Sequence, residues 1–182
     1  MNIVTTPIEG LLIIQPKVFN DGRGYFFESF RQDLFDNAGI KVNFVQDNQS
    51  LSQKGVLRGL HYQEPPHAQG KLVRVIKGAV LDVAVDIRKN SPTYGQSYSI
   101  ELTESNNTVF WVPEGFAHGF LTLEDDTIFS YKCTNYYNKP AEGGLMWNDP
   151  DLSINWGFDN PLISDKDKLL YKFKDFKTPF NI

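Results

Sequence analysis

The sequence has one cysteine, no long apolar run and no excess of positive charge, and each shortage excludes a class of protein. Cys133 is alone among 182 residues, so an internal disulfide or a cysteine-rich zinc site is excluded and a reducing, cytoplasmic setting is favoured. The apolar runs are shorter than a membrane-spanning helix, and we expect no signal peptide at the N-terminus. The formal net charge of −4 predicts no nucleic-acid or membrane partner.

The composition is that of an ordinary folded protein, apart from a high share of aromatic residues. Hydrophobic residues make up 41% and charged residues 22% of the chain, and a length of 182 residues fits one domain spanning 1–182. Aromatic residues reach 14%. This share suits β-structure, and it also suits a binding site that stacks on rings.

Short apolar segments recur along most of the chain, separated by turn-forming residues. We predict strands in residues 11–14, 42–48, 56–63, 71–76, 80–87, 94–102, 109–112, 117–123 and 127–133. Helices are expected only at 32–37 and, with an apolar face of Leu169, Leu170 and Phe173, after Ser164. The pattern predicts an all-β fold, an antiparallel sandwich or barrel with short peripheral helices.

The segment 56–63 is the most informative of these strands because it carries Arg58 and His61 among apolar residues. A buried charge needs a partner, and either an anionic ligand or a core carboxylate would serve for Arg58. Strict alternation places these two side chains on opposite faces of the strand. If both line one cavity, the strand must bulge or kink, and Gly59 is the expected position.

The three histidines do not have the spacing of a metal site. His61 and His67 are six positions apart with two prolines between them, and His118 is distant in sequence. A metal-dependent cupin oxygenase would bind its metal with a close H-x-H pair, which this chain lacks. The pattern therefore disfavours a metal, and we expect none.

Four residues are candidates for catalysis, each with an ordinary structural alternative. His61 suits a general base because imidazole titrates near neutral pH, although many buried histidines only bond a backbone carbonyl. Asp167 is placed to orient that ring or to cap a helix after Ser164, and its two oxygens allow both. Tyr131 is either a general acid or a packed core residue. Lys71 is either solvated or positioned to stabilise an oxyanion.

Arg23, Arg58 and Lys168 are candidates for binding phosphate through charge-assisted hydrogen bonds. Each of them alone is more often a surface or ion-pair residue, so these residues by themselves do not identify a phosphate ligand.

Taken as ordered blocks, the sequence resembles the dTDP-4-dehydrorhamnose 3,5-epimerases, the sugar-nucleotide epimerases of the rhamnose pathway. The blocks are residues 21–30, 44–50, 57–63, 71–75, 112–120, 131–134, 142–144, 147–150 and 164–167. Any one block is weak, but their shared order over most of the chain is specific.

The resemblance implies a cupin-type jelly roll that acts as a homodimer without a cofactor on a dTDP-4-keto-6-deoxy sugar. His61 would be the base, oriented by Asp167; Tyr131 would be the acid on the opposite face of the sugar, and Lys71 would stabilise the enolate oxygen. It also implies that residues bind nucleotide and sugar, some from the partner subunit: Arg23, Glu28, Gln46, Asp47, Asn48, Arg58, Lys71, His118, Glu142 and Lys168.

Alternatives to double epimerisation remain open from the sequence. One is a 3-epimerase acting at a single carbon, or a keto-isomerase, of the same fold. Another, of a different class, is a non-catalytic sugar-binding jelly roll. The orientation of the Tyr131 side chain helps to decide between double and single epimerisation, and a sequence does not give that orientation.

Overall fold

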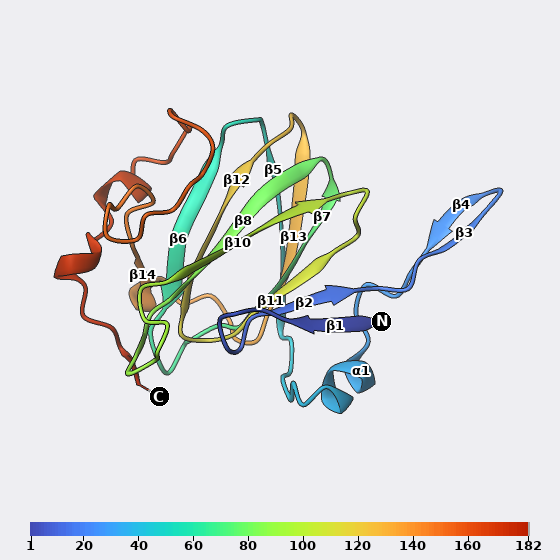
Figure 1. Ribbon diagram of the computed structural model, residues 1–182, viewed down its shortest axis with the longest axis horizontal. Coiled ribbons are helices and arrows are strands. Elements are labelled where there is room, and N and C mark those ends of the chain that lie inside the picture. Colours follow the sequence, from blue (N-terminus) through green and yellow to red (C-terminus); the bar gives the residue numbers. More distant parts are fainter. Residues whose placement is uncertain (182) are drawn as a thin grey trace.

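The computed structural model describes residues 1–181 and contains two antiparallel sheets packed face to face (Figure 1). The predicted all-β fold is confirmed, and the arrangement is a jelly roll of the cupin type. The one-domain interpretation of residues 1–182 stays a prediction, and its last residue, Ile182, lies outside the described residues. Within residues 1–181, no helix is long and apolar enough to cross a membrane.

The first sheet has six strands. Their order across the sheet is β1 (Asn2–Thr5), β2 (Leu12–Gln15), β11 (Val109–Val112), β7 (Lys71–Lys77), β13 (Thr127–Cys133) and β5 (Gln46–Ser52).

The second sheet has five strands. Their order is β10 (Ser97–Thr103), β8 (Ala79–Asp86), β12 (Phe116–Thr122), β6 (Leu57–Gln63) and β14 (Glu142–Gly144).

The remaining elements are short. They are the hairpin of β3 (Phe19–Asp21) and β4 (Gly24–Phe26), the parallel pair β9 (Arg88–Lys89) and β15 (Phe180–Asn181), the helix α1 (Gln32–Asn37), and the 3-10 turns η1 (Lys139–Ala141), η2 (Asp167–Leu169) and η3 (Phe173–Asp175).

The space between the two sheets is filled by aromatic and branched side chains from both. Phe110 and Phe129 come from the first sheet, and Phe120 comes from the second. The rings of Phe120 and Phe129 stack with centroids 4.0 Å apart. This core holds the two sheets together at the middle of the molecule.

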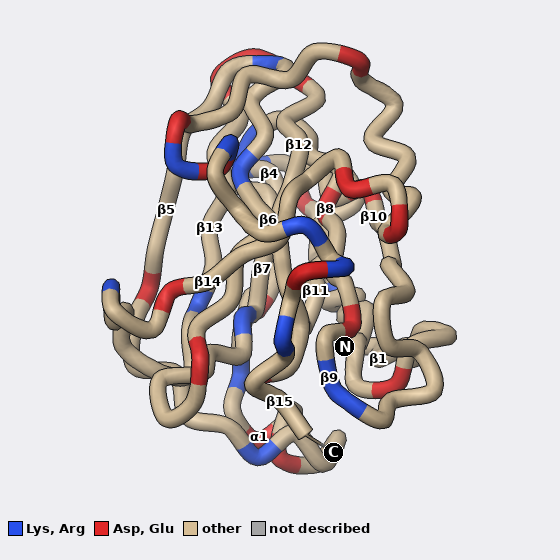
Figure 2. The backbone as a smooth tube through the Cα atoms, turned by 90° about the vertical axis from the view of Figure 1, so that its left-hand side faces the viewer, with Lys and Arg blue, Asp and Glu red and all other residues tan. Residues whose placement is uncertain are grey.

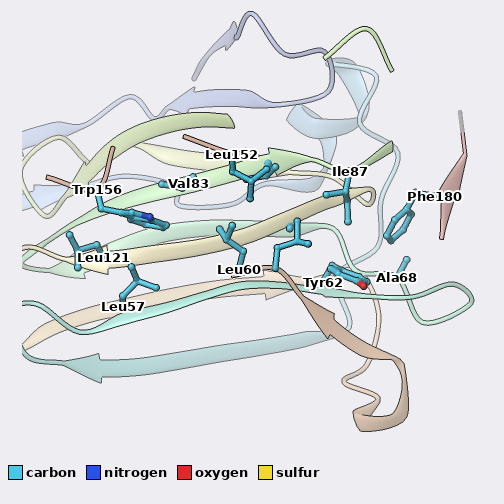
Figure 3. Close-up of a cluster of buried hydrophobic side chains, with 13 residues drawn as sticks. Leu57, Leu60, Tyr62, Ala68, Val83, Ile87, Leu121, Leu152, Trp156 and Phe180 are labelled. Atoms are coloured by element: carbon cyan, nitrogen blue, oxygen red, sulfur yellow. The ribbon is translucent and has the colours of Figure 1, made fainter. Parts of the chain in front are cut away.

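The outer face of the second sheet is covered by the C-terminal part of the chain. Leu57 and Leu121 project from the sheet toward Trp156, and Tyr62 lies near Phe180 (Figure 3). Leu81, Val83, Val85 and Ile87 alternate onto this face, and all four belong to this outer cluster. The packing fixes the segment that carries Asp167 against β6.

The segment before β5 covers part of the outer face of the first sheet. Phe35 of α1 packs with Phe44, and Phe44 packs in turn with Trp111 of β11. The predicted strand at 42–48 is therefore wrong in its first half: Val42 and Phe44 belong to this cluster and β5 begins at Gln46. The apolar residues there signalled packing rather than a strand.

The amphipathic helix predicted after Ser164 is also wrong. Two separate 3-10 turns, η2 and η3, form instead, and Leu169 is 85% exposed rather than lying on an apolar face. The predicted capping contact does form, because the N–H of Asp167 donates to Oγ of Ser164 at 3.1 Å. One capped turn is sufficient to position Asp167.

The hairpin of β3 and β4 extends away from the two sheets, on the side opposite the C-terminal segment (Figure 1). Its aromatic residues are exposed, with Tyr25 and Phe26 at 60% and 66%.

Acidic and basic residues are interspersed along the chain (Figure 2).

Candidate active site

A cavity of about 510 Å³ opens between the two sheets. Its walls bring together residues that are far apart in the sequence. They include His61, Arg58 and His118 from the second sheet, Lys71 and Tyr131 from the first, and Asp167 from η2. The geometry thus gathers the four candidate catalytic residues around one cavity.

A bulge at Gly59 lets Arg58 and His61 line the same cavity. In the pairing of β12 with β6, His118 is opposite His61 but Phe120 is opposite Arg58, so β6 contains one extra residue. The predicted kink is confirmed. Gly59 has φ +137°, and a Cβ atom there would lie 2.5 Å from Cα of Gly119, so only glycine fits this close approach.

His61 and Asp167 form a hydrogen-bonded pair on the wall made by the second sheet. Nε2 of His61 lies 2.7 Å from Oδ1 of Asp167, whose side chain is 5% exposed. Burial acts to raise the pKa of this carboxyl, but the bond to His61, with bonds from Gly59 N–H and Ser164, outweighs it and lowers the pKa. The carboxylate stays ionised and fixes the imidazole ring, with Nδ1 left for other contacts.

Tyr131 and Lys71 lie on the facing wall, on the neighbouring strands β13 and β7. Burial raises the pKa of the Tyr131 phenol, so the group keeps its proton at neutral pH. Burial also lowers the pKa of the Lys71 ammonium, although nearby Cys133 and Asp82 oppose that shift. A protonated phenol thus faces the imidazole across the cavity, with an amine on its own wall.

A second histidine–carboxylate pair lies beside the first, and the sequence analysis missed one member of it. Nε2 of His118 is 2.9 Å and 3.0 Å from the two oxygens of Asp82, which is fully buried in β8. The available signal was a carboxylate between apolar residues in the middle of a strand, on the face of Val80 and Ala84. Such a residue needs a buried partner.

Glu142 and Lys166 form an ion pair near the cavity. Nζ of Lys166, which lines the cavity, is 2.5 Å from Oε1 of Glu142, and the Tyr137 hydroxyl donates to Oε2 at 2.8 Å. Burial acts to raise the pKa of Glu142, but these two bonds outweigh it and lower the pKa. Lys166, which the sequence analysis did not select, is the lysine of this turn that reaches the cavity.

Gln46 and Asn48 lie on the inward face of β5. Nε2 of Gln46 donates to Oδ1 of Asn48 at 3.0 Å, and Asn48 is opposite Tyr131 in the pairing of β5 with β13. Gln46 also accepts a bond from the backbone N–H of Tyr137 at 2.8 Å. These amides extend the polar wall beyond Tyr131.

The other candidate binding residues lie outside this cavity in the single chain. Arg23 pairs with Asp21 at 2.5 Å on the exposed hairpin, and Glu28 lies 3.5 Å from Arg31. Two further ones form surface ion pairs: Asp47 with Lys132 at 3.0 Å, and Lys168 with Asp165 at 2.8 Å. The structure does not bring these four side chains to the cavity.

His67 is also remote from the cavity, and its Nε2 lies 3.3 Å from Nδ2 of Asn138. Over residues 1–181, no group of three or more His, Cys, Asp or Glu side chains is placed to hold a metal ion.

Comparison with known proteins agrees with the geometry. The model of the dTDP-4-dehydrorhamnose 3,5-epimerase family matches residues 5–175. A dTDP-4-dehydrorhamnose 3,5-epimerase from Shigella flexneri is 55% identical over 176 residues, covering 96% of this chain and 97% of that protein.

Two solved structures extend the likeness to three dimensions. A dTDP-4-dehydrorhamnose 3,5-epimerase from Elizabethkingia anophelis superposes with a TM-score of 0.92 at 49% identity, covering 96% of this chain and 97% of that one. A dTDP-6-deoxy-D-glucose-3,5-epimerase from Legionella pneumophila, in complex with dTDP-4-keto-L-rhamnose, gives 0.90 at 49% identity, covering 93% and 90%.

The jelly roll carries His61 and Tyr131 on facing walls of one cavity, and the similar proteins are named epimerases, so the class of the protein is an isomerase. The family match covers nearly the whole chain. The chain belongs to the dTDP-4-dehydrorhamnose 3,5-epimerase family.

Proposed function

We propose that the protein converts dTDP-4-dehydro-6-deoxy-D-glucose to dTDP-4-dehydro-L-rhamnose by inverting C3 and C5. The observation that carries this proposal is the placement of the His61–Asp167 pair and the Tyr131 phenol on opposite walls of one cavity. The names of the family and of the similar enzymes support the same reaction.

The chemistry needs a base, an acid and a cation. The C4 ketone acidifies the hydrogens on C3 and C5, and removal of either gives an enolate with its charge on O4. His61 takes the proton from one face, and Tyr131 returns a proton from the other face, which inverts the carbon. Lys71 stabilises the charge on O4. Only protons move, so the reaction consumes no oxidant or reductant.

Asp167 acts through His61. Its ionised carboxylate holds the imidazole in one orientation and stabilises the imidazolium that forms after proton removal. The short bond of 2.7 Å and the burial of the carboxylate support this role.

Substrate binding in this proposal combines the cavity wall with a second copy of the chain. Arg58 and His118 line the cavity, and Arg58 would bind phosphate. Asn48, Gln46 and Glu142 lie next to its lining residues. Arg23 and Glu28 reach a substrate only if they come from a partner, and the exposed hairpin suits that reach. We therefore propose a homodimer in which the hairpin of one copy closes the cavity of the other.

Asp47 and Lys168 have a less direct place in this proposal. Both are held in exposed ion pairs, and each would contact the nucleotide only after exchanging its present partner. We further propose one jelly-roll domain over residues 1–182 and a cytoplasmic location, which the single cysteine supports.

Proton NMR of the substrate in D₂O, with purified protein, tests the reaction. We expect deuterium at both C3 and C5 and conversion to the L-sugar. Exchange at C3 alone would indicate a single-carbon epimerase. Binding without exchange would indicate a sugar-binding protein and would overturn the proposed function.

A further inference from the structure

Asp82 is a fully buried carboxylate to which the proposed mechanism gives no role. It lies in the middle of β8, between Val80 and Ala84 on the inward face of the strand. Among the described residues its side chain bonds only His118, whose Nε2 is 2.9 Å and 3.0 Å from the two carboxylate oxygens. Burying a carboxylate is costly unless positive charge and hydrogen-bond donors compensate it, and one imidazole is a small compensation.

The packing of the core places Asp82 across the sandwich from Lys71. Val80 and Ala84, which flank Asp82 on its face of β8, belong to the same core cluster as Val73 of β7. Lys71 comes two residues before Val73, so its side chain lies on the same inward face of β7, where it lines the cavity. The carboxylate and the ammonium therefore point toward the same interior space from opposite sheets.

Lys71 is surrounded by several titratable and charged groups, but it has no direct partner. None of the ion pairs formed by the described residues involves Lys71. The groups that share its cavity or act on its pKa are Tyr131 and Cys133 from β13, Arg58 and His61 from β6, His118 from β12, Asp82 from β8, Glu142 from β14, and Lys166 and Asp167 from the segment at η2.

Asp82 is the carboxylate of this set that can keep Lys71 cationic. Burial lowers the pKa of Lys71, and Cys133, Asp82 and Glu142 oppose that shift, in decreasing order. Burial raises the pKa of the Cys133 thiol, so this group carries no charge near neutral pH. Glu142 is bound to Nζ of Lys166 at 2.5 Å, which neutralises its charge. The carboxylate of Asp82 has no lysine or arginine partner of its own.

We propose that Asp82 is a positioning residue, which anchors His118 through Nε2 and whose charge keeps Lys71 in the ammonium form that the reaction needs. Asp82 is fully buried and does not line the cavity, so it acts through these two side chains and not on the substrate. The inference rests on the proposed function, in which the ammonium stabilises the charge on O4. The effect of Asp82 on the ammonium itself needs no substrate and can be measured on the protein alone.

Asp82→Asn tests the assignment, because asparagine keeps an oxygen for Nε2 of His118 but removes the charge. Without the nearby negative charge, the pKa of Lys71 should fall by about one pH unit. The decrease of kcat on the alkaline side should begin at a correspondingly lower pH, while kcat near pH 6 stays close to that of wild type. NMR titration of protein carrying ¹³C-labelled lysine measures the pKa directly, with the Lys71 signal assigned by its loss in Lys71→Arg.

Asp86→Asn is the matched control, since Asp86 is the other fully buried carboxylate of β8, and Arg88 neutralises it at 2.7 Å away from the cavity lining. This variant should move neither the pKa of Lys71 nor the pH profile. Melting temperatures show which variants fold, and Asp82→Ser, measured in the same way, replaces Asp82→Asn if that variant does not. Combined with Lys71→Arg, Asp82→Asn should no longer move the alkaline side of the profile, because arginine does not titrate there.

An unchanged pKa of Lys71 in the folded Asp82 variant would overturn the proposal, and a lower melting temperature with that result would leave Asp82 a purely structural role. A shift of the alkaline side that persists in the Lys71→Arg background would also overturn it, since another group would then carry the effect. Failure of the proposed function is separate: wild-type protein would exchange no deuterium, yet its Lys71 signal would still respond to Asp82→Asn.

Discussion

Nε2 of His61 lies 2.7 Å from Oδ1 of Asp167 and joins β6 to a turn 106 positions further along the chain. Considered alone, each of the two residues could have an ordinary structural role instead of a catalytic one. Together, in the wall of a cavity that also holds Tyr131 and Lys71, they form an oriented imidazole. The first predictions follow from this pair.

His61→Asn should abolish deuterium uptake at both C3 and C5, because asparagine cannot accept the proton. We expect a rate loss of about 10²–10⁴-fold or more, measured by proton NMR in D₂O. His67→Asn is the matched control, since His67 lies outside the cavity. Full exchange by the His61 variant would remove it as the base.

Asp167→Asn should make stability less dependent on pH. Because the folded-state pKa of Asp167 is lowered, its carboxylate stabilises the fold above its unfolded pKa of about 3.9, and this contribution is lost as pH falls through the folded value. We expect the variant's free energy of unfolding to be about 1–3 kcal/mol lower than that of wild type at pH 7. This difference should become smaller below about pH 4. Thermal melting of both proteins across pH measures it; a constant difference would contradict the linkage.

Tyr131→Phe should slow inversion more than proton removal. The variant keeps the ring in the core but loses the acid, so wash-in of deuterium continues while the L-sugar forms about 10²–10⁴-fold more slowly, most plainly at C5. Tyr98→Phe is the control, because Tyr98 packs in the same core without lining the cavity. Equal losses of exchange and inversion would assign Tyr131 another role.

Lys71 should set the alkaline side of the pH profile. Burial lowers the pKa of its ammonium. We therefore expect kcat to decrease at a pH below about 10.4, the ordinary pKa of lysine, because the cation near O4 is lost there. Burial raises the pKa of Tyr131, so the phenol titrates at higher pH. Lys71→Arg should lower the rate but move the fall to higher pH. A profile flat to pH 10.5 would contradict this.

Gly59→Ala should destabilise the fold and the site together. The position has φ +137° and no room beside Gly119, so β6 must shift, at a cost of roughly 2–4 kcal/mol by urea unfolding. Gly22→Ala is the control, since a Cβ there meets nothing within 4 Å. A variant as stable as wild type would show that the bulge tolerates a side chain.

The sequence predicted much of the fold because most strands carry apolar residues in a regular pattern. The predicted first and last residues of β11 and β13 are the same as in the structure. β5 was misjudged because its inward residues, from Gln46 to Ser52, are polar, so the strand lacks the apolar alternation that marks the other strands. Helix periodicity failed after Ser164 for a related reason, since that segment is fixed by contacts to β6 and to the outer cluster rather than by its own propensity.

The candidate site was predictable where charged or titratable residues stand in a single apolar strand. His61, Arg58 and the kink at Gly59 came from one short segment, and the structure brings the two side chains to one cavity. The roles of the site residues stay predictions until the variants are measured.

Asp167 joins the cavity from a segment that follows every strand of the two large sheets. A chain interrupted near residue 160 would retain all eleven of those strands and the imidazole, yet lack the carboxylate that fixes it. During synthesis, the nascent protein therefore acquires the carboxylate partner of His61 last, so under the proposed mechanism fragments released early would be inactive even if their sheets assemble.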